Sequence, residues 1–479
     1  MATATTTLTA RALSAQLGDW RAHSGTLAQA LSDRVRLLIL DGRIALGARL
    51  PAERQLADHE GVSRTTVAAA YARLRELGYL ISRRGSGSVA ALPAGDVPAF
   101  DIVDRPDLLD FSKATLPALP AVVDAAAAAV QRLPHHLGLA GFDLFGLDEL
   151  RAALADRYTA RGLPTSPEQM LVTLGAQHAI ALIATALIGR GDRALVENPS
   201  YPHALEALTA AGARLVGVPV SADAGWDDDA LAQLFPRSAP SLAYLMPDVH
   251  NPTGRIMPDE QRARVAALAD RHGTRLIVDE TMADLAVDGV SRQPMAVHSP
   301  RIITVGSVGK SVWGGIRLGW IRADRDTIAE LARARPPGDL GSPTLEQLLL
   351  LELLPRYDEL VGERRAQLRR GEALLRELLA GQLPDWRLPQ IEGGLVLWTN
   401  LGRPVASELA LVARAEGVQI GAGPRFSVDG AFERYVRLPF CYPEPLIRRA
   451  VDGLERAWQR LDSGSHRPAT SDALVDAVL

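Results

Sequence analysis

The chain has 479 residues, 47% of them hydrophobic, so it can bury a large core and divide into two or more domains. Its single cysteine, Cys441, excludes an internal disulfide framework, and no apolar run of about 18 residues could span a membrane. The net charge of −4 is unevenly distributed, because residues 1–95 hold 12 Arg and no Lys against 7 Asp and Glu, a local balance of +5. We therefore expect a cytoplasmic protein that joins a basic module suited to nucleic acid to an acidic body.

The first part of the chain is predicted to be a small helical module. Apolar positions recur at helical spacing over residues 7–19 and 26–41, and residues 51–80 indicate two helices joined by a tight turn at Gly61. Ser63 is a good N-cap, which gives an otherwise apolar helix a polar first turn. A recognition helix inserts this part into the major groove of DNA. The residues of that turn are Arg64, Thr65 and Thr66.

A hairpin is predicted next, because ISRRGSGSVAAL, residues 81–92, has two short β-like runs around a Gly/Ser turn. Arg83 and Arg84 at its tip can reach a phosphate backbone or the minor groove. The alternative is a helical domain with a solvated arginine loop. Residues 50–88 resemble the winged helix-turn-helix of GntR-type bacterial regulators, which implies a double-stranded DNA operator as partner. By that resemblance the residues at or near DNA are Arg54, Ser63, Arg64, Thr65, Thr66 and the wing residue Gly85.

The remainder is predicted to be an α/β body with a mainly parallel sheet. Short β-like runs alternate with amphipathic helices such as ELRAALADRYTARG and EQRARVAALADRHG. The runs are MLVTLGA, RALVENP, LAYLMPD, RLIVDE and RIITVGS. From about residue 357 helices return, with VLWTN and YVRLPF as expected strands of a small C-terminal α+β subdomain. The predicted divisions are 1–90 for the DNA-binding module, 91–109 for a linker rich in Pro, Asp and Gly, 110–462 for the body and 463–479 for a mostly disordered tail.

Lysine is rare in this chain. Of its 52 Lys and Arg residues only Lys113 and Lys310 are lysines. Arg cannot lose its proton near neutral pH, whereas an ε-amine in a suitable environment can, and it then attacks a carbonyl. Lys310, in TVGSVGKSVWGGIRLGW, is therefore a candidate for a Schiff base with pyridoxal 5'-phosphate, and a solvated loop lysine is the alternative. No role for Lys113 follows from the sequence.

That cofactor needs a phosphate cradle, an acid for the pyridine nitrogen and a donor to the ring 3-oxygen. TLGAQHAI runs from a strand into a helix, where free N–H groups hold an anion, and Ser307 with Arg317 as a bidentate clamp could complete the cradle. Asp279 ends the apolar run LIV and can keep the pyridine nitrogen protonated. Asn251 in HNPTG could donate to the ring oxygen, and Tyr201 in ENPSYP could add a ring face or hydroxyl. The predicted cofactor residues are Gly175, Ala176, Gln177, Tyr201, Asn251, Asp279, Ser307, Lys310 and Arg317, and no metal site is predicted.

Singly, each of these motifs has an ordinary structural explanation, but their order and spacing resemble fold type I aminotransferases from residue 110 to 460. With the N-terminal module in front, the chain resembles the MocR subgroup of GntR regulators. The resemblance implies that Arg437 of YVRLPF pairs with a substrate or effector carboxylate, and an Arg salt-bridged within the small domain is the alternative. Met282 stands where many relatives have a Tyr that contacts the ring oxygen, and Gly309 stands where Ser often precedes the Lys. Because of these two differences from the family pattern, at Met282 and Gly309, we do not expect fast transamination.

Three functions are compatible with these patterns. The first is a transcription regulator in which an amino compound or the cofactor itself acts at Lys310 and changes the placement of two DNA-binding modules in a homodimer. The second is a working aminotransferase whose N-terminal domain only tethers or regulates it. The third is a DNA-binding protein whose body is a structural dimer without cofactor. Met282 favours the first over the second, and Lys310 disfavours the third.

Overall fold

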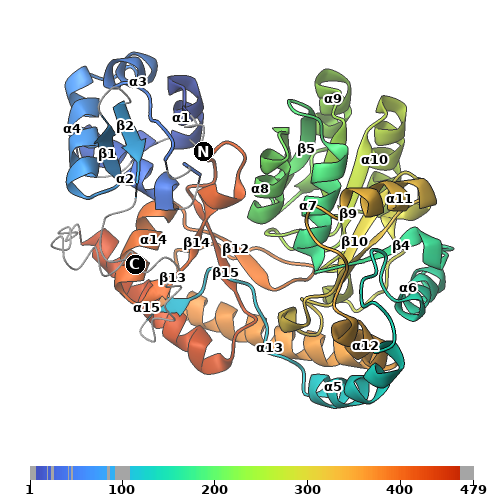
Figure 1. The fold of residues 1–479 in the computed structure, drawn as a ribbon. Helices are drawn as coiled ribbons and strands as arrows, with labels where there is room; N and C mark the ends of the chain where they lie inside the picture. The colour runs from blue at the N-terminus through green and yellow to red at the C-terminus, as the bar shows by residue number, and fades with distance from the viewer. Residues whose placement is uncertain are drawn as a thin grey trace.

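An N-terminal module, a large sheet domain and a small C-terminal domain follow one another in the computed structural model (Figure 1). The structure describes residues 7–18, 20–22, 26–40, 43–44, 47–83, 87–91 and 108–463. The predicted linker and tail fall mostly outside these residues. Within the described part of the chain, no helix is long and apolar enough to cross a membrane.

The N-terminal module consists of helices followed by an antiparallel hairpin. Its elements are α1 Ala10–Leu17, α2 Leu27–Leu40, α3 Glu53–Glu60, α4 Arg64–Glu76, β1 Leu80–Arg83 and β2 Gly87–Ala90. Gly61 adopts a φ of +64°, which ends α3 in the left-handed turn that glycine favours. Trp20, Val35 and Tyr71 are buried between the helices. The predicted helices and hairpin strands are therefore present.

An eight-stranded sheet in the order β4-β11-β10-β9-β8-β5-β6-β7 forms the centre of the large domain. Neighbouring strands from β6 to β10 are parallel, whereas β11 runs antiparallel to both of its neighbours. This confirms the mainly parallel sheet, and all five quoted β-like runs form strands. The strands are β4 Met170–Thr173, β5 Arg193–Asn198, β6 Arg214–Ser221, β7 Gly225–Trp226, β8 Leu242–Leu245, β9 Arg275–Asp279, β10 Ile303–Ser307 and β11 Gly319–Arg322.

Helices bury both faces of this sheet, which explains why the middle positions of the central strands are mostly apolar. Ile277 and Val305 belong to one hydrophobic cluster, with α7 and α8, whereas Val278 and Trp320 belong to a second cluster, with α6 and α10. The helices around the sheet are α5 Ala121–Arg132, α6 Asp148–Ala160, α7 Ala176–Leu187, α8 Pro202–Ala210, α9 Asp228–Ser238, α10 Asp259–His272, α11 Arg325–Ala334 and α12 Thr344–Leu353.

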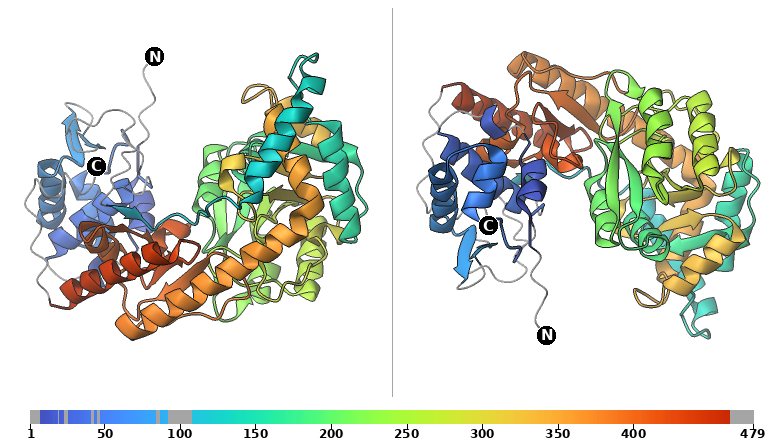
Figure 2. Two further views of the ribbon diagram at one scale, coloured as in Figure 1. Left: turned by 90° about the horizontal axis from the view of Figure 1, so that it is seen from below. Right: turned by 90° about the horizontal axis from the view of Figure 1, so that it is seen from above.

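The long helix α13, Tyr357–Gln382, leads from the large domain to the small one (Figure 1). A three-stranded sheet in the order β12-β15-β14 packs there against two helices. The elements are β12 Val396–Asn400, α14 Ala406–Ala415, β14 Gly421–Ala422, β15 Tyr435–Pro439 and α15 Glu444–Asp462, and a separate pair is formed by β3 Leu109–Asp110 and β13 Val418–Gln419. The views in Figure 1 and Figure 2 agree that the N-terminal module lies against this small domain.

Candidate functional site

Motifs that lie far apart in the sequence meet at one edge of the sheet. The strands β4, β5, β8, β9 and β10 all run in the same direction, so their carboxyl ends share an edge. Ligands bind at this edge in open α/β sheets. The residues at or after these ends are Gly175, Tyr201, Asn251, Asp279 and Lys310. Two contacts link these motifs to others, because Arg437 Nη1 donates to Asn251 Oδ1 at 3.5 Å and Arg317 Nη2 donates to the carbonyl of Leu174 at 3.3 Å.

The Lys310 amine has surroundings that favour its neutral, nucleophilic form. Burial lowers the pKa of Lys310 from its ordinary value. The Cys441 thiol and the Asp279 carboxylate act against this decrease, whereas the positive charges of Arg437 and Arg317 add to it. Its Nζ donates to the carbonyl oxygen of Ala114 at 2.7 Å, and no carboxylate among the described residues forms an ion pair with it. The amine is therefore held by a neutral backbone acceptor, and its pKa is lowered overall by burial.

The Asp279 carboxylate is buried and receives two hydrogen bonds. The hydroxyl of Tyr244, in β8, donates to Oδ2 at 2.7 Å, and the backbone N–H of Thr281 donates to Oδ1 at 2.9 Å. Burial raises the pKa of Asp279 above its ordinary value, whereas the Tyr244 and Thr281 hydrogen bonds act against this rise. A carboxylate in this state is suited to a proton or a cationic N–H group that approaches from the open side of the edge.

A candidate anion cradle lies where β4 leads into α7. Gly175 has a φ of +88°, and α7 begins at Ala176, so the first N–H groups of the helix have no intrahelical acceptor. A Cβ on Gly175 would lie 3.3 Å from Nη2 of Arg317, which shows how closely the guanidinium approaches the cradle. Ser307 is less free than predicted, because its hydroxyl donates to the Leu318 carbonyl at 2.8 Å and accepts from the Gly309 N–H at 3.0 Å. Gln177 donates to the His203 carbonyl at 2.9 Å.

Arg437 projects from β15 of the small domain toward the strand edge. Its Nη1 donates to Asn251 Oδ1 at 3.5 Å, Nη2 donates to the carbonyl of Ser112, and the guanidinium lies 4.7 Å from the ring centroid of Phe426. Burial lowers the pKa of Arg437 to about 10, and no carboxylate among the described residues forms an ion pair with it. Its Nε has no hydrogen-bond partner in the described part of the chain. A buried cation with spare donors is a candidate binder for a carboxylate.

Sequence reasoning missed the contributions of Tyr244 and Phe426. An isolated Tyr in the aliphatic run LAYLMPD is a signal that could have identified Tyr244, because a buried hydroxyl needs a hydrogen-bond partner. No local signal identifies Phe426, which reaches Arg437 only through the fold of the small domain. Met282 is buried, and its Cε lies 3.6 Å from the position of a Cβ on Gly394, so an apolar contact takes the place of a ring-oxygen donor.

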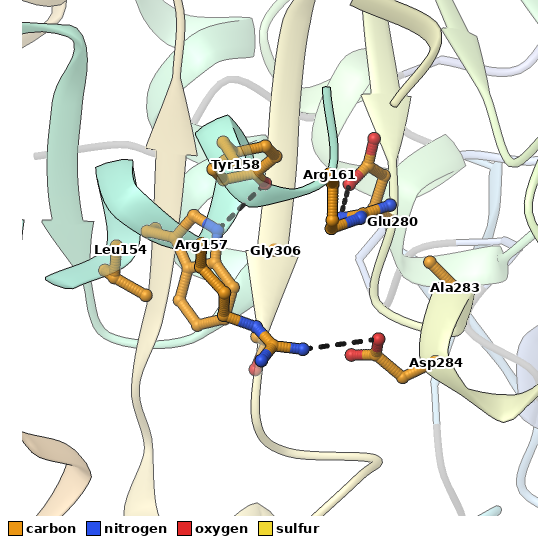
Figure 3. Close-up of a pocket in the computed structure, with 10 residues that line it drawn as sticks. Leu154, Arg157, Tyr158, Arg161, Glu280, Ala283, Asp284 and Gly306 are labelled. Carbon is orange, nitrogen blue, oxygen red and sulfur yellow. Dashed lines mark hydrogen bonds and ion pairs between the residues drawn. The ribbon is translucent and has the colours of Figure 1, made fainter. Parts of the chain in front are cut away.

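A recess beside α6 is lined partly by Ser307 of the predicted cradle and partly by residues outside the predicted site, such as Tyr158 and Trp320 (Figure 3). It has about 380 Å³ of empty space, part of it open to solvent. Arg157 pairs with Asp284 at 3.7 Å, and Arg161 pairs with Glu280 at 2.9 Å. Glu280 directly follows Asp279, so it points to the other face, where burial raises its pKa to about 7. Both arginines already have carboxylate partners, and we place the candidate site at the strand edge.

The candidate DNA-binding surface is the first turn of α4. The Ser63 hydroxyl caps the helix by accepting from the Thr66 N–H at 3.0 Å, as predicted. Arg64 and Thr65 are exposed. Arg54 in α3 is also exposed, with Nε 3.9 Å from Asp58 Oδ2. The other predicted wing residues, Arg84 and Gly85, and the side chain of Arg83 lie outside the described residues.

Comparisons with known proteins identify relatives of both parts. The profile of the family described as "Aminotransferase class I and II" matches residues 108–454, and that of "Bacterial regulatory proteins, gntR family" matches residues 27–89. The HTH-type transcriptional regulator TauR of Rhodobacter capsulatus is 31% identical over 482 residues, covering 89% of this chain and 96% of TauR. The probable rhizopine catabolism regulatory protein MocR of Rhizobium meliloti is 28% identical over 483 residues, covering 91% and 95%.

The fold has solved counterparts among aminotransferases. The crystal structure of LysN, an α-aminoadipate aminotransferase from Thermus thermophilus, is similar with a TM-score of 0.67 and 29% identity. The similarity covers 74% of this chain and 93% of LysN, and that crystal contains N-(5'-phosphopyridoxyl)-L-leucine.

Proposed function

Because the chain belongs to the class I and II aminotransferases and carries the N-terminal domain of gntR-family bacterial regulators, we propose that it is a transcription regulator that senses an amino compound, or pyridoxal 5'-phosphate itself, through a Schiff base at Lys310. The observation that carries this proposal is that Lys310 and Asp279 lie at one edge of the sheet, where Arg437 contacts Asn251, in a chain whose α4 has an exposed polar tip. We expect it to act in the cytoplasm.

The residues of the strand edge fit pyridoxal 5'-phosphate in their chemistry. Lys310 supplies an amine with a lowered pKa, and Asp279 supplies a buried carboxylate for the pyridine nitrogen. The N–H groups at Gly175, Ala176 and Gln177, with Arg317 and Ser307, would hold the phosphate. Asn251 accepts from Arg437 through Oδ1, which leaves its NH₂ group to donate to the ring oxygen, and Tyr201 would contact the ring. When bound, the cofactor supplies an aldehyde for amines and a ring that acts as an electron sink.

The effector is proposed to carry a carboxylate beside its amine. Arg437 is buried, has no ion-pair partner among the described residues and retains an Nε donor, so an incoming carboxylate would compensate its charge. This contact would direct the effector amine toward the strand edge that carries Lys310, because Arg437 contacts Asn251 at that edge. The crystal of LysN, which contains a phosphopyridoxyl derivative of leucine, gives an amino acid as a reasonable first ligand.

DNA is the proposed macromolecular partner, and the proposed assembly is a homodimer. The gntR-family match and the solvent-exposed Arg64 and Thr65 support recognition of double-stranded DNA by α4. Two such modules in a dimer would read paired half-sites, so the effector would act by changing their relative placement. Exposed apolar side chains near α5 are compatible with a covered dimer face; they are Val123, Val130, Leu137, Leu139 and Phe142.

A working aminotransferase is the second candidate. The set of Lys310, Asp279, Asn251 and Arg437 supports it, because the same groups can serve turnover or sensing. Met282 argues against fast turnover, since its buried thioether cannot donate to the ring oxygen.

The test is the visible absorption spectrum of the purified protein with added pyridoxal 5'-phosphate, compared between wild type and Lys310→Ala. We expect a Lys310-dependent band that shifts with one amino compound without release of keto acid, together with a protected DNA site near the gene in footprinting. A band that cycles with keto acid at about 1 per second or faster would make the protein an enzyme. The absence of a band in both proteins would refute cofactor binding.

A further inference from the structure

One buried arginine of α2 fastens the N-terminal module to the small domain. Arg34, which is 3% exposed, forms an ion pair with Glu433 and donates to Ser407 Oγ at 2.9 Å. The same guanidinium donates to the carbonyl oxygens of Leu17 at 2.8 Å and Gly430 at 3.3 Å. A single side chain thus joins α1 and α2 to two parts of the small domain.

The acidic partner is held as firmly as the arginine. The backbone N–H of Ser407, in the first turn of α14, donates to Glu433 Oε2 at 3.0 Å, and its hydroxyl donates to Oε1 at 2.7 Å. Both charges of the pair are buried, so separating them leaves an uncompensated charge away from water. Breaking this contact is therefore costly unless both charges regain water or another partner.

Further contacts extend along residues 423–433, which we call the coupling segment. Arg43 Nη1 donates to the carbonyl of Pro424 at 2.9 Å. A Cβ on Gly430 would lie only 2.7 Å from the carbonyl oxygen of Gln16, so the two domains meet here backbone to backbone. The DNA-binding module thus contacts the coupling segment at Pro424, Gly430 and Glu433.

The inner side of the same segment contacts the candidate site. The ring of Phe426 lies beneath Arg437, and the carbonyl oxygen of Phe426 accepts from the N–H of Ser200 at 2.8 Å. Ser200 directly precedes Tyr201, and the N–H of Val428 donates to Asn198 Oδ1 at 3.3 Å. Movement of Arg437 or of the loop after β5 must therefore be accommodated by the coupling segment.

We propose that the coupling segment transmits the state of the cofactor and effector pocket to the DNA-binding module through the Arg34–Glu433 pair. This inference rests on the proposed sensing function and adds to it the element that both sites act on. A packed segment with a buried ion pair on one side and the ligand-binding Arg437 on the other is able to couple two sites, because binding at either favours one arrangement of it.

The packing of α2 against α4 would connect the Arg34–Glu433 pair to the DNA-binding surface. Asp33 lies beside Arg34 in α2, and its Oδ1 is 3.8 Å from Nη2 of Arg73 in α4 and 3.2 Å from Nη2 of Arg36. Val35 of α2 and Tyr71 of α4 share one hydrophobic cluster. A displacement of α2 therefore carries the recognition helix with it.

The experiment titrates pyridoxal 5'-phosphate into full-length wild type, Arg34→Met and the control Arg21→Met, following the Lys310-dependent band. Arg21 belongs to the same module but pairs with Glu60 inside it, 3.8 Å apart. We expect the dissociation constant for pyridoxal 5'-phosphate to rise about fivefold or more in Arg34→Met, the lower end of ordinary coupling, because the coupling segment loosens behind Tyr201. Arg21→Met should match wild type.

Glu433→Gln supplies a second variant if Arg34→Met does not fold, since its amide retains hydrogen bonding to Ser407 while removing the charge. The exchanged pair Arg34→Glu/Glu433→Arg should recover part of the affinity. Equal dissociation constants in wild type and in every folded variant, with the band intact, would overturn the inference and leave the proposed function standing. No band in wild type would overturn the proposed function, and the inference with it.

Discussion

The hydrogen bond from Tyr244 to Asp279 offers a sharp test of how the site controls charge. Tyr244→Phe removes only the hydroxyl that donates to Oδ2 at 2.7 Å and leaves the packing of the buried ring unchanged. A hydrogen bond to a charged group contributes about 1.5–3 kcal/mol, so its loss should raise the pKa of Asp279 further above its ordinary value. The carboxylate would then hold a cationic ring nitrogen less well.

We expect the affinity of Tyr244→Phe for pyridoxal 5'-phosphate to fall about tenfold at neutral pH, since about 1.4 kcal/mol corresponds to a factor of ten. The alkaline shift of the Asp279 titration should appear in absorption spectra of the loaded protein recorded across pH. Tyr158→Phe is a matched control, because Tyr158 is equally buried and accepts from Trp320 Nε1 at 3.0 Å on the opposite face of the sheet. Equal affinity and an equal pH profile in Tyr244→Phe and wild type would refute the role of this hydrogen bond, and an equal change in both variants would show a general packing effect.

Three further predictions concern the buried charges and the DNA surface. The folded-state pKa of Asp279 is raised, so the contribution of this carboxyl group to stability falls as pH rises. In the cofactor-free protein, Asp279→Asn should therefore unfold at a higher temperature than wild type at neutral pH. The difference in unfolding temperature should vanish below about pH 4, where the carboxyl group is protonated in both the folded and the unfolded chain. Thermal unfolding recorded at several pH values checks this, and an Asn variant of unchanged or lower stability at neutral pH would contradict it. Arg437→Met should abolish the response of the visible band to amino acids while leaving the band itself, and a titration of the loaded variant that still shifts would assign carboxylate binding elsewhere. Arg64→Ala should weaken binding to the footprinted DNA. It should also reduce the slope of the logarithm of the binding constant against the logarithm of the salt concentration by about one, because the variant lacks the charge that would neutralise a phosphate. Mobility shift at several salt concentrations measures this slope, and the cofactor band should stay unchanged; an unaltered slope and affinity would place the DNA-binding surface elsewhere.

The sequence predicts the location of those site residues that lie at the carboxyl ends of parallel strands. Asp279 and Lys310 each follow an apolar run that becomes a parallel strand, and such strand ends share an edge whatever the rest of the fold. The strands β6 and β11 escaped prediction although both are part of the sheet, because glycine and proline interrupt RLVGVPVS and GWIR has only 4 residues. Ser307 shows another limit, since its type and spacing suit a phosphate donor but its hydroxyl is already engaged by backbone groups.

Contacts between distant segments are the part that sequence patterns do not give. The carbonyl groups of Ser112 and Ala114 hold Arg437 and Lys310, yet any residue has a carbonyl group, so no side-chain pattern marks them. The Arg34–Glu433 pair is equally hidden, because its members lie in different domains and each resembles an ordinary surface charge in its own segment. Such contacts depend on how the domains are placed, which local periodicity does not determine.

The charges of the candidate site argue against a purely structural body. Burial lowers the pKa of Lys310 and Arg437 and raises that of Asp279, so in each case the folded chain disfavours the charged form. Apolar residues of similar size would make a cofactor-free dimer more stable at these positions. A ring nitrogen would supply a charge partner for Asp279 and a carboxylate one for Arg437, while the neutral Lys310 amine would be the form that reacts with the cofactor aldehyde, so ligand binding would stabilise the fold. These three groups lower the stability of the cofactor-free protein. A ligand that binds them would therefore act strongly on the arrangement of the coupling segment, which contacts Arg437.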